Sequence, residues 1–268
     1  MIKLFASDID NTLENDSFPL SERVKKAMVE MQKKGVTLVL ATGRILKSVL
    51  PMIEAFEMER FHGYAICHGG SLVYDCSSKE IIESLDIKPE GLAELYAYAK
   101  EHQLGYCCDQ RDAVICTEYG PGPAYDFEVV GMDVILSRLH FMSYIKEPVF
   151  KSGFTASKEV LDEKTADAIA RFSKDYTIYR ATPTNIDITV AKASKGQALA
   201  NLVKRLGLKK EEILALGDGD NDIGMIELAG IGLAIGNGSV AIKKAADRVL
   251  DRVEREGVLK AIELALQG

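Results

Sequence analysis

Short apolar runs alternate with amphipathic stretches along most of the chain. The runs at residues 2–6, 36–41 and 213–216 are almost continuously apolar, which is typical of strands buried on both faces of a parallel sheet. Between them apolar residues recur at helical spacing, as in the segment that Ser21 opens as N-cap and Gly35 ends. The order strand, helix, strand, helix predicts an α/β fold: a doubly wound parallel sheet with a Rossmann-like core.

The alternation changes from about residue 83. Helical and β-type segments then follow one another without a regular strand–helix order, and Gly120–Pro123 is expected to be a loop because it alternates Gly and Pro. The strand–helix rhythm returns after residue 190. We therefore expect 83–190 to be a smaller α+β domain inserted into a core made of 1–82 and 191–268.

Polar side chains stand where the buried runs end. Asp8 and Asp10 follow the first run, Thr42 follows the second, and Asp218 begins an acidic stretch after the third. Because open parallel sheets bind ligands at the carboxyl ends of their strands, neighbouring strands would gather these groups in one crevice. Taken alone, each acidic stretch is also compatible with an ordinary turn, since Asp and Asn are common turn residues.

Composition narrows the class of partner. The 268 residues carry a net charge of −7, which disfavours nucleic acid and anionic membrane surfaces. No apolar stretch reaches the roughly 18–20 residues of a membrane span, and Asp8 interrupts the amino-terminal run before it could be a signal peptide. The five cysteines include no Cys-x-x-Cys pair, so free thiols and a cytoplasmic location are expected.

Several carboxylates in one crevice repel one another. Two unit charges about 4 Å apart cost about 4 kcal/mol at an effective dielectric constant of about 20. Either the pKa values rise or a cation binds, and hard oxygen ligands around an open site suit Mg²⁺. Neighbouring groups indicate phosphate: Thr42 offers a hydroxyl, Gly43 lets backbone N–H groups approach where a helix begins, and Lys195 adds a positive charge.

Carboxylates do not bind phosphate directly, so these side chains would hold the metal or react with phosphorus. We expect Asp8 to be a nucleophile that forms an aspartyl-phosphate. Asp10 is then placed to protonate the leaving oxygen and afterwards to activate water.

Four segments in this order resemble the motifs of the haloacid dehalogenase (HAD) superfamily: Asp8-x-Asp10-x-Thr12, Thr42-Gly43-Arg44, Ser194-Lys195-Gly196 and Gly217-Asp218-x-x-Asn221-Asp222. The insertion between the second and third segments resembles the Cof-like branch of sugar-phosphate phosphatases (HAD type IIB), whose α+β cap occupies that position. The chain departs from the family pattern at Asn11, where Gly is usual, and at His68, where Asn is usual.

The resemblance implies a Mg²⁺ site. Asp8 is implied as nucleophile and ligand, Asp10 as acid–base group and as ligand through its backbone carbonyl, and Asp218 as a further ligand. Asp222 is implied to lie with the metal.

The resemblance also implies a phosphate site. Thr42, Lys195 and Asn221 are implied to contact the phosphate, beside Gly43. Arg44 either touches the substrate or forms a surface salt bridge.

The expected activity is that of a Mg²⁺-dependent phosphatase, a hydrolase that acts on a small phosphorylated metabolite. A phosphotransferase or mutase acting on sugar phosphates is one alternative, and a regulator that binds a phosphometabolite with little turnover is another. The substrate and the oligomeric state stay open.

Substrate contacts are expected in the inserted domain. The candidates are more often surface or core residues than ligands; they are Tyr106, Asp109, Arg111, Tyr119, Arg138 and Arg180. His68, in the core, is expected either to be a loop-capping or solvated residue or to lie at the rim of the site.

Overall fold

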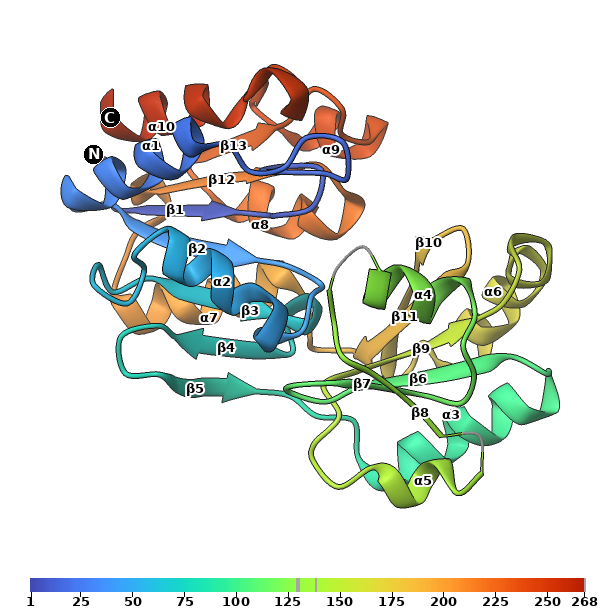
Figure 1. Ribbon diagram of the computed structural model, residues 1–268. Helices are drawn as coiled ribbons and strands as arrows, with labels where there is room; N and C mark the ends of the chain where they lie inside the picture. The colour runs from blue at the N-terminus through green and yellow to red at the C-terminus, as the bar shows by residue number, and fades with distance from the viewer. Residues whose placement is uncertain (129–130, 138, 268) are drawn as a thin grey trace. The chain divides into compact units, whose positions relative to one another are not determined.

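The computed structural model describes residues 1–128, 131–137 and 139–267 (Figure 1). It divides into two compact units, each with its own apolar core. The second unit consists of Arg44–Ser48 and Ser84–Ala193, and the first unit comprises Met1–Gly43, Val49–Glu83 and the chain from Ser194 onward.

The first unit contains one sheet with the strand order β14-β13-β12-β1-β2-β3-β4-β5. The strands from β14 to β3 pair in parallel, and β4 runs antiparallel to β3. The predicted doubly wound parallel core is confirmed. The strands are Leu4–Ser7 (β1), Thr37–Ala41 (β2), Tyr64–Cys67 (β3), Leu72–Asp75 (β4), Glu80–Ser84 (β5), Ile213–Gly217 (β12), Ile231–Ala234 (β13) and Arg248–Val249 (β14).

Helices cover both faces of this sheet (Figure 1). Helices α1 and α10 pack against each other on one face, and α7, α8 and α9 pack on the other. Both faces of the central strands are therefore buried, which is why those strands are almost entirely apolar. The helices are Glu22–Lys33 (α1), Leu46–Ala55 (α2), Lys195–Leu206 (α7), Ile223–Leu228 (α8), Val240–Ala245 (α9) and Val258–Gln267 (α10).

The ends of two helices follow from local chemistry, and the Ser21 cap is as predicted. The Ser21 hydroxyl accepts the N–H of Val24 at 3.2 Å and caps α1. The chain leaves α7 through Gly207, whose φ of 66° lies in the left-handed region that glycine adopts without strain.

The second unit has a sheet with the strand order β10-β11-β9-β6-β7-β8. Its buried core includes residues of α3, α5 and α6 and of four of these strands, among them Leu95, Phe154 and Ile186. The strands are Gly105–Asp109 (β6), Val114–Cys116 (β7), Val134–Leu136 (β8), Lys151–Thr155 (β9), Tyr176–Thr182 (β10) and Asn185–Val190 (β11). The helices are Pro89–Glu101 (α3), Pro121–Glu128 (α4), Phe141–Tyr144 (α5) and Lys158–Phe172 (α6).

The expected loop at Gly120–Pro123 is wrong, because helix α4 begins at Pro121. Proline is tolerated in the first turn of a helix, where its missing N–H would have had no helical partner. The alternation of Gly and Pro therefore marks the start of a helix here rather than a break.

Within the part of the chain that the structure describes, no helix has the length and hydropathy that crossing a membrane requires. The five cysteines are free and buried.

Candidate active site

Strand β1 lies between β2 and β12, so the polar groups that follow these three strands share one edge of the sheet. Ser7 is in register with Leu216 of β12 and with Leu40 of β2. Asp218 therefore follows the strand on one side of Asp8, and Thr42 follows the strand on the other. Because the chain leaves β1 toward β2 and returns at β12, this edge is the topological switch point of the sheet.

Three carboxylates meet beside one ammonium group. Asp8, Asp218 and Asp222 each offer an oxygen, and these atoms lie within 4.8 Å of one another. The Lys195 Nζ is 2.6 Å from Asp8 Oδ1 and 2.7 Å from Asp222 Oδ1. The second carboxylate oxygen of Asp8 is buried and has no hydrogen-bond partner among the residues that the structure describes.

Close backbone packing places Lys195 at the start of α7. Ser194 caps the helix, and Gly70 approaches it so closely that a Cβ on Gly70 would lie 2.2 Å from the Ser194 carbonyl carbon. Gly196, which follows Lys195, is also close to a neighbouring helix: a Cβ on Gly196 would lie 2.8 Å from the Cα of Gly224 in α8. Glycine at these positions lets the helix start reach the acidic cluster.

Asp222 is engaged through both of its oxygens. Its Oδ1 accepts from Lys195, and its Oδ2 accepts the backbone N–H groups of Asp218 and Gly219 at 3.1 and 3.0 Å. A Cβ on Gly217 would lie 2.5 Å from the Asp222 Cβ, so the loop closes only around a glycine. Asp222 thus orients both the lysine and the loop that carries Asp218.

Burial dominates the electrostatics of the acids. It raises the pKa of Asp8 well above the ordinary value; Lys195 opposes this rise, whereas the neighbouring carboxylates of Asp222, Asp218 and Asp10 add to it. Burial and Asp222 raise the pKa of Asp218 to about 6, again against Lys195. For Lys195 burial lowers the pKa, but the Asp222 and Asp8 carboxylates outweigh it and raise the pKa above its ordinary value. The cluster holds more negative charge than one ammonium neutralises.

Asp10 and Thr12 complete the first acidic segment. Asp10 is half-buried. Thr12 is fully buried, and its hydroxyl donates to Asp218 Oδ1 at 3.3 Å. The sequence motif included Thr12, but only the fold indicates its partner, which lies 206 residues away.

The residues expected at phosphate lie in different surroundings. Thr42 is buried, and its backbone N–H donates to the Ile66 carbonyl at 2.8 Å. Apart from its two chain neighbours, no described residue has an atom within 4 Å of the position that a Cβ on Gly43 would take. Asn221 is exposed beside the acidic loop, and Arg44 is grouped with the second unit. Their contacts with phosphate or substrate stay proposals.

His68 is not solvated, since its side chain is fully buried at the end of β3. The next N–H, that of Gly69, donates to the Thr42 carbonyl at 3.0 Å. The solvated interpretation is wrong, and the His68 loop lies next to Thr42.

Among the candidates in the second unit, Tyr106 belongs to the apolar core and Asp109 forms a buried ion pair with Lys151 at 3.1 Å. The phenol of Tyr119 donates to Glu128 at 2.7 Å. Arg111 pairs with its neighbour Asp112, and Arg138 lies outside the described residues.

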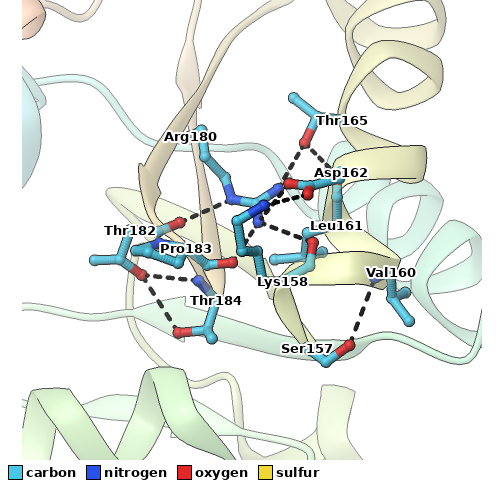
Figure 2. Close-up of polar contacts among 10 residues, drawn as sticks. All are labelled: Ser157, Lys158, Val160, Leu161, Asp162, Thr165, Arg180, Thr182, Pro183 and Thr184. Atoms are coloured by element: carbon cyan, nitrogen blue, oxygen red, sulfur yellow. Dashed lines mark hydrogen bonds and ion pairs between the residues drawn. The ribbon is translucent and has the colours of Figure 1, made fainter.

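Arg180 joins a β-turn to helix α6 (Figure 2). Its guanidinium donates to the Thr182 carbonyl at 2.8 Å, to the Thr165 hydroxyl at 3.1 Å, and to the carbonyls of Lys158 and Pro183. These contacts give the Arg180 side chain a structural role within the second unit.

Known proteins resemble this chain along nearly its whole length. The family of haloacid dehalogenase-like hydrolases matches residues 5–262. The 5-amino-6-(5-phospho-D-ribitylamino)uracil phosphatase YcsE of Bacillus subtilis is 29% identical over 97% of this chain and 94% of its own. The protein YxeH of the same organism is 30% identical over 99% of both chains.

Solved structures share the fold. A haloacid dehalogenase-like hydrolase from Bacteroides thetaiotaomicron superposes with a TM-score of 0.91 at 26% identity, over 98% of this chain and 99% of its own. A subclass IIB sugar phosphatase shares the fold with a TM-score of 0.83 at 22% identity, over 98% of each chain. The predicted enzyme class, a hydrolase of the phosphatase type, is confirmed. The chain belongs to the haloacid dehalogenase-like hydrolase family.

Proposed function

We propose that the protein is a Mg²⁺-dependent phosphatase that hydrolyses a small phosphorylated metabolite through an aspartyl-phosphate. One observation carries the proposal: among the described residues, Asp8 Oδ2 is buried without a hydrogen-bond partner, in a cluster of three carboxylates beside the Lys195 ammonium. A buried carboxylate oxygen without a donor is costly unless a ligand completes it.

The donor set fits Mg²⁺. The cluster offers only carboxylate oxygens, the ligands that this hard cation prefers, and it has an excess of negative charge. Asp8 and Asp218 would hold the ion with the Asp10 carbonyl, and Asp222 would contribute from beside them. When bound, the ion would neutralise charge on the carboxylates and on the phosphoryl oxygens.

Asp8 would act as the nucleophile. Its carboxylate oxygen forms a bond to phosphorus while the bond from phosphorus to the substrate oxygen breaks. Asp10 donates a proton to that leaving oxygen. In the second half-reaction Asp10 takes a proton from water, the water oxygen attacks phosphorus, and the Asp8–phosphorus bond breaks to release inorganic phosphate.

Lys195 supports this chemistry from within the first unit. Its ammonium favours the ionised, nucleophilic form of Asp8. An ammonium has three N–H bonds and two of them face Asp8 and Asp222, so the third could donate to a phosphoryl oxygen. Thr42 and Asn221 would supply further donors.

The name of one relative supports a substrate class. The relative YcsE is named for a phosphorylated ribitylaminouracil, so we propose that this chain acts on phosphomonoesters of sugars, polyols or related metabolites. The inserted unit would act as a cap that sets selectivity, as in the family that the motifs resemble.

A phosphate-release assay tests the proposal. The purified protein is incubated with Mg²⁺ and p-nitrophenyl phosphate, and then with sugar phosphates, nucleotides, flavin mononucleotide, pyridoxal phosphate and phosphorylated ribitylaminouracil. We expect release of inorganic phosphate, and a loss on the order of 10⁴-fold or more in Asp8→Asn. Acid-quenched wild-type enzyme should carry a phosphoryl group on the peptide that contains Asp8.

The matched control is Asp16→Asn, because it makes the same acid-to-amide change at an exposed residue of the following loop. It should retain wild-type turnover. Undiminished phosphate release by Asp8→Asn would refute the mechanism, and transfer of the phosphoryl group to a sugar instead of water would establish a phosphotransferase.

A further inference from the structure

We propose that Asn237 is a positioning residue for the acidic cluster: it holds the turn after Asp10 in the one orientation that aligns Thr12 with Asp218. The inference rests on the proposed function, since it assigns the residue a part in metal binding. Asn237 lies between β13 and α9, outside the four sequence motifs.

Both ends of the Asn237 amide are used. Its Nδ2 donates to the backbone carbonyl of Asn11 at 2.7 Å, and its Oδ1 accepts the backbone N–H of Val253 at 3.0 Å. Asn11 offers an acceptor and Val253 offers a donor, so only one orientation of the amide satisfies both. The side chain therefore connects the turn after β1 to the segment that precedes α10.

The contact with Asn11 fixes a rigid group. The carbonyl of Asn11 and the N–H of Thr12 belong to one planar peptide. Asn237 holds the carbonyl, while the N–H donates to the Ile9 carbonyl at 3.1 Å. Held from both sides, this peptide sets the position of the Thr12 hydroxyl, which donates to Asp218 Oδ1 at 3.3 Å.

The turn needs such support. Asn11 has a φ of 60°, in the left-handed region, and is exposed. Asn adopts this region more readily than most residues with a side chain, but the conformation is uncommon for any residue other than glycine. A hydrogen bond from outside the turn favours the observed conformation.

Residues 237–239 also hold the loop that carries Asp218. The N–H of Ser239 donates to the Asp218 carbonyl at 2.8 Å, and a Cβ on Gly238 would lie 3.0 Å from that oxygen. Residues 237–239 thus contact both loops that carry the acids. Like charges drive these loops apart, so a frame that joins them keeps the ligand oxygens at the spacing a cation needs.

Mg²⁺ affinity of the substrate-free enzyme tests the inference. Asn237→Asp keeps the acceptor for Val253 but places a carboxylate against the Asn11 carbonyl. Simple Coulomb attraction predicts tighter Mg²⁺ binding for the added negative charge, whereas loss of the turn predicts weaker binding. We expect about 10-fold weaker Mg²⁺ binding by titration calorimetry, as is typical when a group behind the ligands is removed.

Asn237→Ala removes both hydrogen bonds without adding charge, and we expect its Mg²⁺ affinity to fall at least as far. Asn15→Ala is the control, since the Asn15 amide oxygen caps its own turn by accepting the backbone N–H groups of Ser17 and Phe18. Unchanged or tighter Mg²⁺ binding by folded Asn237→Asp overturns the inference, and should this variant not fold, Asn237→Ala decides in the same way. Absence of Mg²⁺-dependent phosphate release in the wild type would instead refute the proposed function.

Discussion

The ammonium nitrogen of Lys195 lies 2.6 Å from Asp8 Oδ1, although 187 residues separate the two in sequence. Both side chains are almost completely buried, and Asp222 shares the ammonium at 2.7 Å. Removing one member of such a group leaves a buried charge without compensation, which costs more than the intact pair contributes.

Replacement of the lysine should therefore destabilise the fold as well as the chemistry. We expect Lys195→Met to lower the free energy of unfolding by about 3–5 kcal/mol in urea titrations without metal, because two buried carboxylates lose their cation. Lys204→Met is the control on the same helix, since Lys204 is exposed. Equal free energies of unfolding for the two variants would contradict this reading of the cluster.

Metal removal should abolish phosphate release, and added Mg²⁺ should restore it. In Asp218→Asn one of the proposed carboxylate ligands becomes a neutral amide, so we expect the half-saturating Mg²⁺ concentration to rise about 10-fold or more. The stabilisation by Mg²⁺, measured as a rise in Tm, should shrink in parallel. Asp220→Asn makes the same change at the exposed neighbour and should keep the wild-type Mg²⁺ response. Turnover that is independent of Mg²⁺ would exclude the metal from the mechanism.

Gly70 should tolerate no side chain. Its φ of 106° lies in the left-handed region, and an added Cβ would lie 2.2 Å from the Ser194 carbonyl carbon. Gly70→Ala must shift the peptide that leads into Lys195, so we expect both lower stability and lower turnover. Gly35→Ala distinguishes backbone strain from steric clash. Gly35 has a φ of 90°, but apart from its chain neighbours no described residue has an atom within 4 Å of its Cβ position. It should cost roughly 1–2 kcal/mol and leave turnover unchanged; equal effects of the two substitutions would argue against the close approach.

The second unit should show a pH-dependent stability that Asp109 controls. Burial raises the pKa of Asp109 to about 6; Lys151 opposes this rise, and Asp187 adds to it. The unfolded carboxyl titrates at about 3.9, so between these values the folded state binds more protons. The free energy of unfolding therefore falls as pH rises through this window.

The difference between wild type and Asp109→Asn isolates this contribution. Relative to the variant, the wild type's free energy of unfolding should decrease by up to about 3 kcal/mol from about pH 4 to about pH 7. Denaturant titrations at intermediate pH values measure the slope. Asp112→Asn, at a half-exposed neighbour, should keep the wild-type slope; the same slope in Asp109→Asn would assign the titration to another group.

The periodicity of apolar residues and the local chemistry of helix ends were enough to predict the architecture of the first unit. A strand buried on both faces needs an unbroken apolar run, and helix ends need caps such as Ser21 and Gly207. Buried strands and helix ends can therefore be recognised from residue types along the sequence. The order of the motifs likewise predicted that Asp8, Lys195 and Asp218 belong together. The inserted segment was harder, and α4 was missed because Pro121 can open a helix as well as prevent one.

By itself, the sequence determined the fold class and the family, and it predicted which acids belong to the candidate site, because these depend on residue types at short range and in fixed order. Only the tertiary structure decided which groups meet: Thr12 on Asp218, Asp222 on Lys195, and Asn237 on the carbonyl of Asn11. Such contacts join strands and loops that are distant along the chain, and their geometry depends on sheet order and on how closely backbones approach at Gly70 and Gly196. The local pattern of residues indicates neither the order of the strands in the sheet nor how closely the backbones approach.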